Sequence, residues 1–339
     1  MSDLKINNIT NRSGDGGPVI AGVSTVATSA FMVMPSGNTE IRGAGSGRGV
    51  FAGAANPASQ NVMDFVEIAT TGNAIDFGDL NTIWYLLGGC ASATRGIWFP
   101  GYDQSNDVST IFYTTISSEG GVVDFGDTLN TSRNHSGACS DSTRAVRAEG
   151  YNSAISARTN TLEFITIATT GNSSVFGDLN RAMSDMAGSF ASPTRGFFGG
   201  GKGPETNIID YITIQSGGTA IDFGDLIDGT RSEGSGSSNS TRGLFFSGSG
   251  PGSADTIQYI TMATLGDATD FGNLSGNNES GGACASSTRG LYAGGSTPTK
   301  INNIEFVTIA STGNATDFGD RNVVGFGVGA CSDVHGGLG

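Results

Sequence analysis

Hydrophobic and polar residues alternate along this chain in short runs. In residues 257–263, Ile257 and Tyr259 share one face of an extended chain, while Ile260 and Met262 share the other. A period of two predicts β-strands, and two partly apolar faces are typical of a strand whose sheet packs between two neighbouring sheets. Segments rich in glycine, serine and asparagine separate the runs and predict tight turns. The pattern therefore predicts an all-β protein.

Six copies of one unit fill the chain from about residue 47 to its end. Each copy has a Thr-Arg-Gly segment or a close variant, a variable loop, a strand with a central aromatic residue, a Thr-Gly-Asn-like turn and an Asp-Phe-Gly-Asp-like segment. The arginines lie 47, 49, 51, 47 and 47 residues apart, at Arg48, Arg95, Arg144, Arg195, Arg242 and Arg289. Intervals of this size are typical of β-propeller blades.

One part of the unit has a fixed length and another part varies. The central aromatic residue precedes the phenylalanine of the Asp-Phe-Gly-Asp segment by 12 residues in all six copies, as from Phe65 to Phe77, which predicts a hairpin without insertions. The distance from arginine to aromatic residue instead runs from 16 to 20 residues, and the intervening sequences are unrelated. Because this variable loop leaves the same strand of every copy, we expect all six loops on one face of a disk.

The order of these segments resembles the kelch family of β-propellers. The sixth copy shows the resemblance best, with a small-residue strand at 281–285, the pair Gly294-Gly295, the pair Glu305-Phe306 and a turn before Phe318. The resemblance covers about 290 residues, although phenylalanine replaces the kelch tryptophan and only two copies keep the Gly-Gly pair. It implies four strands per blade, with the small-residue strand nearest the axis.

The ends of the repeated region predict how the ring closes. Residues 325–333 resemble the first strand of a further copy, whereas the first copy begins at residue 47 without such a strand. We therefore expect the C-terminal strand to complete the first blade and close a six-bladed propeller over residues 47–339. Residues 1–46 lack the landmarks of a seventh blade and are too few for a core of their own. We expect them to form an extended N-terminal docking arm.

The arm contains two apolar runs separated by glycine, serine and proline. Their apolar side chains are the predicted partner-docking residues, namely Val19, Ile20, Val23, Phe31, Met32 and Met34. Together with the Thr-Arg-Gly and Asp-Phe-Gly-Asp repeats, this stretch is similar to the N-termini of virion structural and appendage proteins of tailed phages, particularly those of marine bacteria. The resemblance implies a protein made in the host cytoplasm and built into the virion in multiple copies. It would dock on other virion structural proteins and display its propeller outward.

Composition narrows the range of partners. Glycine supplies 55 of the 339 residues and charged residues only 14%, which is typical of a turn-rich protein with a polar, sparsely charged surface. The net charge of -14 repels polyphosphate, so we expect no nucleic-acid partner. No stretch reaches the roughly 18 consecutive apolar residues of a membrane span, so we expect no membrane insertion. The N-terminus also lacks a charged-then-apolar secretory pattern.

Two repeated groups of charged residues are candidates for chemistry. Aspartate pairs such as Asp76 and Asp79 could contribute to a Ca²⁺ site, but Ca²⁺ takes six to eight oxygens and the pair is incomplete in two copies. We favour hydrogen bonds from these aspartates to turn amides, or ion pairs with the repeated arginines. The arginines could surround an axial channel, or each could tether its blade to the next through carbonyl groups. We favour the tether, since a guanidinium has five donors.

Cysteine and histidine add no catalytic group. Four copies have cysteine at one position, and the other two have Phe190 and Ser237 there. The cysteines are Cys90, Cys139, Cys284 and Cys331. Equivalent positions of different blades are too far apart for a disulfide, so we expect buried free thiols. His135 and His335 are too few for a metal site or a triad. We predict no catalytic residue, no metal and no cofactor, and a protein that is not an enzyme.

The variable loops remain as the candidate functional surface. Their amide, carboxylate and tyrosine side chains suit sugar hydroxyls and apolar sugar faces, although solvated connections would have a similar composition. The candidate ligand-binding residues are Tyr102, Asp103, Tyr151, Asn152, Lys202, Glu205, Asp255 and Lys300.

Three hypotheses for function follow. The leading one is a non-enzymatic structural virion protein of a tailed phage, a capsid decoration, fibre or tail appendage, whose propeller contacts a host-surface glycan. The alternative is an intracellular kelch-like scaffold for protein–protein interaction. A propeller hydrolase or oxidase is disfavoured because the repeats offer no converging acid, base, nucleophile or metal ligands.

Overall fold

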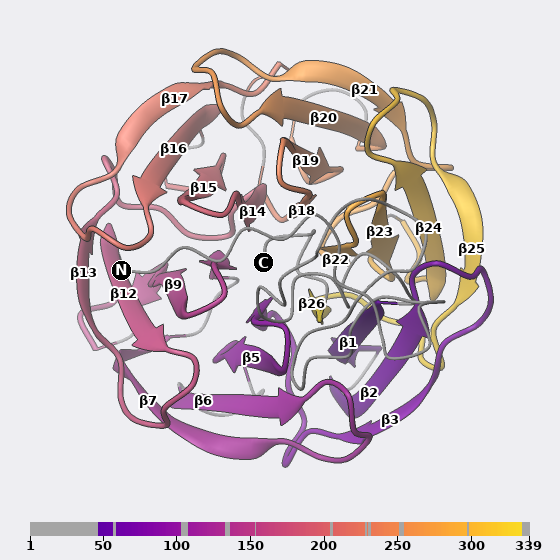
Figure 1. Cartoon of the computed structure of the whole chain (residues 1–339), viewed down its shortest axis with the longest axis horizontal. Helices are drawn as coiled ribbons and strands as arrows, with labels where there is room; N and C mark the ends of the chain where they lie inside the picture. Colours follow the sequence, from indigo (N-terminus) through magenta and orange to yellow (C-terminus); the bar gives the residue numbers. More distant parts are fainter. Residues whose placement is uncertain are drawn as a thin grey trace, which may run out of the picture.

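The protein is a six-bladed β-propeller, shown down its axis in Figure 1. This computed structural model describes residues 47–333 except 57–58, 103–107, 133–135, 153, 204–205, 228, 230–231, 251–253 and 297. The described part contains strands and no helix, and therefore no helix that could cross a membrane. Residues 1–46, with the predicted docking residues Val19, Ile20, Val23, Phe31, Met32 and Met34, lie outside it.

Each blade is an antiparallel sheet, and its strands follow one another from the axis outward in chain order, except that the last strand of the chain is innermost in blade one. The innermost strands are β26 (Gly329–Ser332), β4 (Gly88–Ala91), β8 (Ala138–Ser140), β14 (Gly188–Ala191), β18 (Ser235–Ser238) and β22 (Gly282–Ala285). The second strands are β1 (Arg48–Ala55), β5 (Arg95–Phe99), β9 (Arg144–Ala148), β15 (Arg195–Gly199), β19 (Arg242–Phe246) and β23 (Arg289–Ala293). The third strands are β2 (Ser59–Glu67), β6 (Val108–Thr115), β12 (Thr161–Thr166), β16 (Ile208–Thr213), β20 (Thr256–Thr261) and β24 (Asn303–Thr308). The outermost strands are β3 (Ile75–Asp79), β7 (Val123–Ser132), β13 (Ser174–Asp178), β17 (Ile221–Asp225), β21 (Thr269–Asn273) and β25 (Thr316–Asp320).

The C-terminal strand closes the ring as predicted. β26 pairs antiparallel with β1, with Gly49 opposite Ser332 and Ala52 opposite Gly329. Blade one therefore consists of β26, β1, β2 and β3, and the blades are numbered from it in chain order. Closure leaves no unpaired inner strand, because the first and last strands of the propeller satisfy each other.

Blade two departs from the predicted four strands. Its outermost strand β7 continues to Ser132, and the extension pairs with Asn152 of β10 (Tyr151–Asn152), which itself pairs with β11 (Ala157–Arg158). The sheet of blade two thereby gains two short strands from the variable loop of blade three. This loop is the longest of the six, and its extra residues allow it to reach the neighbouring blade.

The hydrophobic core lies between the blades. The buried residues form six clusters, and each cluster joins the facing surfaces of two adjacent blades. The fixed spacing of 12 residues places two rings of the same blade in edge-to-face contact, with centroids 5.8–6.2 Å apart. A β-bulge at each Asp-Phe-Gly-Asp segment leaves its phenylalanine unpaired and turns that side chain inward.

Every outermost strand is covered by the Thr-Gly-Asn-like turn of the next blade. The amides of Gly120 and Val122 donate to the carbonyls of Phe77 and Asp79, 2.7 and 3.3 Å away, and all six interfaces repeat this pair. These bonds run around the whole ring, since Gly72 of blade one donates to the carbonyl of Phe318 of blade six. These bonds occupy strand edges that would otherwise be free to pair with another chain.

The six repeated arginines tether each blade to the next, as predicted. Each guanidinium lies 4.4–4.7 Å from the centroid of the central aromatic ring of its own blade. Each also donates from Nη1 to a carbonyl of the following blade over 2.8–3.3 Å. Arg289 of blade six reaches Ile68 of blade one, so these tethers also run around the whole ring.

Candidate ligand-binding surface on the loop face

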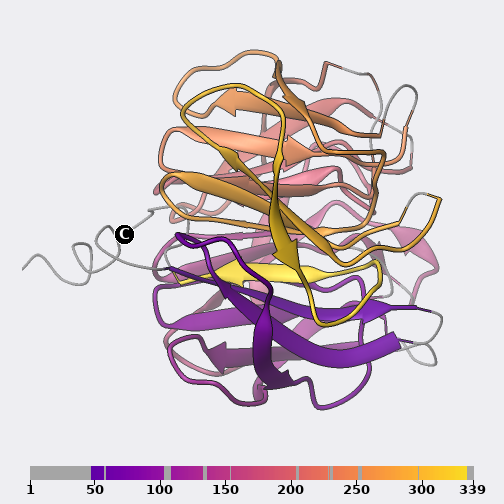
Figure 2. The ribbon, with the colours of Figure 1, turned by 90° about the vertical axis from the view of Figure 1, so that its right-hand side faces the viewer.

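The antiparallel blades give the disk two different faces, seen edge-on in Figure 2. One face carries the turns between first and second strands and between third and fourth strands; we call it the arginine face. The other carries the variable loops and the connections from one blade to the next; we call it the loop face. The described ends of the chain meet on the arginine face, where the amide of Arg48 donates to Asp333 Oδ1 over 2.7 Å.

A ring of residues with left-handed backbone surrounds the axis on the loop face. Its described members are Leu86, Asp185, Glu233, Ser280 and Gly327, with φ between 49° and 73°. Each lies just before an innermost strand, and four amide-to-carbonyl hydrogen bonds of 2.6–2.9 Å join neighbouring members. This conformation is unfavourable for residues with a side chain. The inter-blade hydrogen bonds hold it in place, and we call these residues the mouth ring.

Directly outside the mouth ring, backbone bridges join the inter-blade connections to the variable loops. Tyr85 pairs with Tyr102 through two hydrogen bonds of 3.2 and 2.9 Å, and Phe326 pairs with Ala55. The same bridge recurs in blades four and five as Ser184 with Lys202 and Ser232 with Ser249. In blade six the amide of Ser296 donates to the carbonyl of Glu279.

Three aromatic rings gather where blades one and two meet. Tyr85 lies 5.6 Å from Tyr102 and 5.7 Å from Phe326, with edge-to-face geometry in both pairs. All three side chains are partly exposed. Partial burial, and then the neighbouring Tyr102, raises the pKa of Tyr85, so its phenol stays protonated as a hydrogen-bond donor. Lys300 completes this aromatic cluster, with Nζ 5.1 Å from the centre of the Phe326 ring.

A charged cluster lies beside the part of the mouth ring that blades four to six form. Lys202 Nζ donates to Glu233 Oε1. Burial alone would lower the pKa of Lys202, but its hydrogen bond and charge interaction with Glu233 outweigh this and raise the pKa. Partial burial, and then the carboxylate of Glu233, raises the pKa of Glu279. Lys202 is thus already neutralised by a carboxylate of the protein.

The other predicted ligand residues are spread over the loop face. Tyr151 is partly exposed on β10, but Asn152 is buried and donates its amide to Glu149 Oε1 over 2.9 Å, which makes it part of the scaffold. Asp255 is partly exposed, and its carbonyl accepts from the amide of Leu274. Asp103 and Glu205 lie outside the described residues.

Two residues of the aromatic cluster, Tyr102 and Lys300, are among the predicted ligand residues, whereas Tyr85 and Phe326 are not. Tyr85 and Phe326 belong to connections between blades and therefore lie outside the variable loops. The sequence alone could have indicated them, because Tyr85 and Phe326 occupy one position of the repeat and are aromatic there. Other copies have Ser184, Ser232 and Glu279 at that position.

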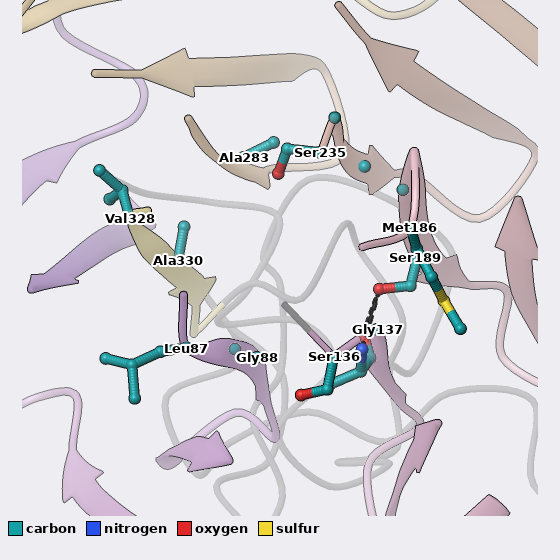
Figure 3. A pocket seen from close by; sticks show the side chains of 15 residues that line it. Leu87, Gly88, Ser136, Gly137, Met186, Ser189, Ser235, Ala283, Val328 and Ala330 are labelled. Atoms are coloured by element: carbon teal, nitrogen blue, oxygen red, sulfur yellow. Dashed lines mark hydrogen bonds between the residues drawn. The ribbon is translucent and has the colours of Figure 1, made fainter. Parts of the chain in front are cut away.

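Two small chambers follow the axis between the innermost strands. The one nearer the loop face, drawn in Figure 3, has a volume of about 40 Å³ and is lined mostly by glycine, alanine and serine, together with Leu87, Met186 and Val328. The second has about 70 Å³ and is bordered by the cysteine position of the repeat. Such volumes hold one or a few water molecules but no sugar.

The four cysteines are buried free thiols, as predicted. The sulfur atoms of Cys139, Cys284 and Cys331 fit beside the glycine of the Thr-Arg-Gly segment of the next blade. A Cβ atom at Gly96 would lie 2.8 Å from Cys331 Sγ. Burial raises the pKa of Cys90 to about 12 and also raises the pKa of the other three thiols.

The repeated aspartates and arginines are not partners of each other in the described part of the chain. The arginines bind rings and carbonyls instead, while Asp124 Oδ1 accepts from the amide of Gly126 over 3.0 Å, a turn bond of the predicted kind. Among the described residues, no three His, Cys, Asp or Glu side chains are close enough together to hold a metal ion. No protein-family model matches this sequence, and no curated protein matches it either.

Proposed function

We propose that the protein is a non-enzymatic structural component of a tailed-phage particle, with a kelch-like propeller that presents its loop face to host-surface glycans. In this proposal residues 1–46 form the arm that docks on other virion proteins. The particle would carry several copies.

The observation that best supports the proposal is that the described ends of the chain and the variable loops lie on opposite faces. Arg48 and Asp333 meet on the arginine face, whereas the aromatic cluster and the described parts of the six variable loops belong to the loop face. A protein held through the segment before residue 47 would therefore turn its loop face away from the attachment point. The rigid, multiply closed ring suits display on a particle surface.

The geometry of the axis supports a binding role over catalysis. Its two chambers have volumes of about 40 and 70 Å³, so the axis, where a propeller could enclose a substrate, is too narrow there for a sugar ring. Incubation with polysaccharides and measurement of released reducing ends tests this part of the proposal. Sustained release of reducing ends would overturn it.

Mass spectrometry of particles purified from a lysate of the producing cells tests the virion assignment. We expect the chain in the particles at a fixed ratio to the other particle proteins. Replacing Ile20 and Phe31 of the full chain by aspartate should remove it from particles, while the exposed substitution Thr264→Ser should not. A chain found only in the soluble cell fraction, bound to cellular proteins, would instead support the intracellular scaffold.

A further inference from the structure

We propose that the aromatic cluster of Tyr85, Tyr102 and Phe326, together with Lys300, binds an acidic saccharide, a sugar ring that carries a carboxylate. This inference rests on the proposed display of the loop face and names the ligand class of that face. The rings would contact the apolar face of the sugar, and the ammonium group of Lys300 would bind its carboxylate.

The propeller does not need aromatic residues at these positions. The bridge that joins Tyr85 to Tyr102 also forms in blades four and five, where it is built from Ser184 with Lys202 and Ser232 with Ser249. The backbone hydrogen bonds are the same, and only the side chains differ. The three partly exposed rings are therefore not required for the fold.

The cluster is held rigidly by close backbone contacts. A Cβ atom at Gly101, next to Tyr102, would lie 2.2 Å from the carbonyl oxygen of Tyr85, and one at Gly325, next to Phe326, would lie 2.8 Å from the Cβ of Ala54. Glycine at both positions lets the segments approach each other. A ligand would therefore meet preformed rings, which lowers the entropy lost on binding.

Lys300 supplies a positive charge that the described residues leave uncompensated. Its ammonium group contacts the Phe326 ring, and no described carboxylate lies within ion-pair distance of it. Lys202, the corresponding cation across the mouth, is paired with Glu233. In a chain of net charge -14, a lysine that contacts the Phe326 ring and has no ion-pair partner among the described residues favours a ligand with one negative group.

The net charge of the protein also limits how much negative charge the ligand can carry. A polyanion would be repelled by the protein as a whole, whereas a single carboxylate within a few ångströms of Lys300 is attracted locally, since physiological salt screens more distant charges beyond about 8 Å. A saccharide with isolated acidic residues therefore suits the local positive charge of Lys300 and the overall negative charge of the protein better than a densely charged saccharide does.

Calorimetry with an oligosaccharide that carries a single uronic acid, and with its carboxyl-reduced neutral counterpart, tests the inference on the full chain. We expect the acidic form to bind about tenfold or more tightly than the neutral form. Lys300→Gln should remove this preference. Tyr102→Ala and Phe326→Ala should weaken binding of both forms about tenfold or more, and Tyr102→Phe should keep most of the affinity.

Lys202→Gln is the matched control, because it removes a cation of the same face whose charge is already paired. It should leave binding of the acidic saccharide unchanged, and denaturation curves of all variants would confirm that they fold. Equal affinity for both saccharides, an unaltered preference in Lys300→Gln, or equal losses in Lys202→Gln and Lys300→Gln would overturn the inference. A chain found in particles that prefers no acidic sugar refutes this inference alone, whereas a chain absent from particles refutes the proposed function.

Discussion

At the scale of single residues, the repeated glycines and cysteines are fixed by what the neighbouring blade places beside them. The glycine of each Asp-Phe-Gly-Asp segment has φ between 138° and 158°, and a Cβ there would lie 2.0–2.6 Å from the backbone of the next blade's turn. No rotamer change relieves a collision with backbone. The short motif is therefore a contact between blades, which explains its repetition better than any chemistry of its aspartates does.

Gly78→Ala should reduce the free energy of unfolding by about 2–4 kcal/mol, because the new methyl group meets the carbonyl of Gly120 in an unfavourable backbone conformation. Urea denaturation measures the change. Gly276→Ala is the control, since nothing lies within 4 Å of a Cβ there, and it should be neutral or slightly stabilising. Equal stability of the two variants would contradict this account of the motif.

The buried thiols should make the protein less stable in mild alkali. Burial raises the folded pKa of Cys90 to about 12 from an ordinary value of 9.0. The unfolded chain therefore loses its thiol protons first, and stability present below pH 9 falls as the pH rises from there towards 12. Denaturation midpoints between pH 7 and 9.5 should fall less steeply in Cys90→Ala. A parallel pH dependence in the two proteins would disagree with this prediction.

At the scale of elements, the sheets are joined by backbone and arginine contacts as well as by their cores. Each blade receives an arginine from the blade before it and covers the outermost strand of that blade with its own turn. On the inner strands, Ser140, Ser238 and Ser332 donate to carbonyls of the preceding blade over 2.6–2.8 Å. A thin four-stranded sheet cannot bury both of its faces alone, so every blade depends on two neighbours.

Arg195→Met should lower the unfolding free energy by about 1–2 kcal/mol, since it removes the hydrogen bond to the carbonyl of Met262 and the contact with the Tyr211 ring. Thermal and urea unfolding measure the loss. Lys300→Met, a surface cation that makes no such tether, should change stability by less than about 0.5 kcal/mol. An Arg195 variant as stable as the wild type would show that the tether contributes nothing.

Removal of the closing strand should abolish the ring. A chain that ends at residue 324 lacks β26 and exposes the edge of β1, so we expect broad unfolding and aggregation through that edge. Size-exclusion chromatography and calorimetry would detect both effects. A chain that ends at residue 333 keeps β26 and should unfold as sharply as the full chain. Cooperative, monomeric behaviour of the shorter chain would rule out closure by β26 as a requirement.

At the scale of the whole molecule, the disk has an attachment face and a display face. This polarity follows from the even number of strands in the repeating blade, because the chain enters and leaves each blade on the loop face. In blade one the C-terminal strand β26 is the first strand and β1 is the second, so the described ends of the chain lie on the arginine face. Ring closure also brings Phe326 and Lys300, from the end of the repeated region, beside Tyr85 and Tyr102 near its start.

Site-selective blocking tests this polarity, because the native cysteines are buried and leave an introduced thiol as the reactive one. Biotin and streptavidin on Pro298→Cys of the loop face should abolish binding of the acidic saccharide. The same complex on Thr264→Cys of the arginine face should leave binding intact. Blocking by both, or by neither, would contradict a binding surface on the loop face.

The sequence by itself determined the fold, because the fold follows from local and periodic rules. Alternation specified the strands, the constant spacing of 12 residues specified the hairpin, and the unmatched segment at 325–333 specified the closure. The reach of β7 towards Asn152 was not predictable, since it depends on a loop in the next blade.

Only the tertiary structure decided which residues form the candidate site. Ring closure places Phe326 and Lys300 beside Tyr85 and Tyr102, whereas the side chain of Asn152 is buried in a hydrogen bond with Glu149. A periodic pattern reports what the copies share. The site consists of what they do not share, and its members are neighbours only in space, at the junction where the last blade meets the first two.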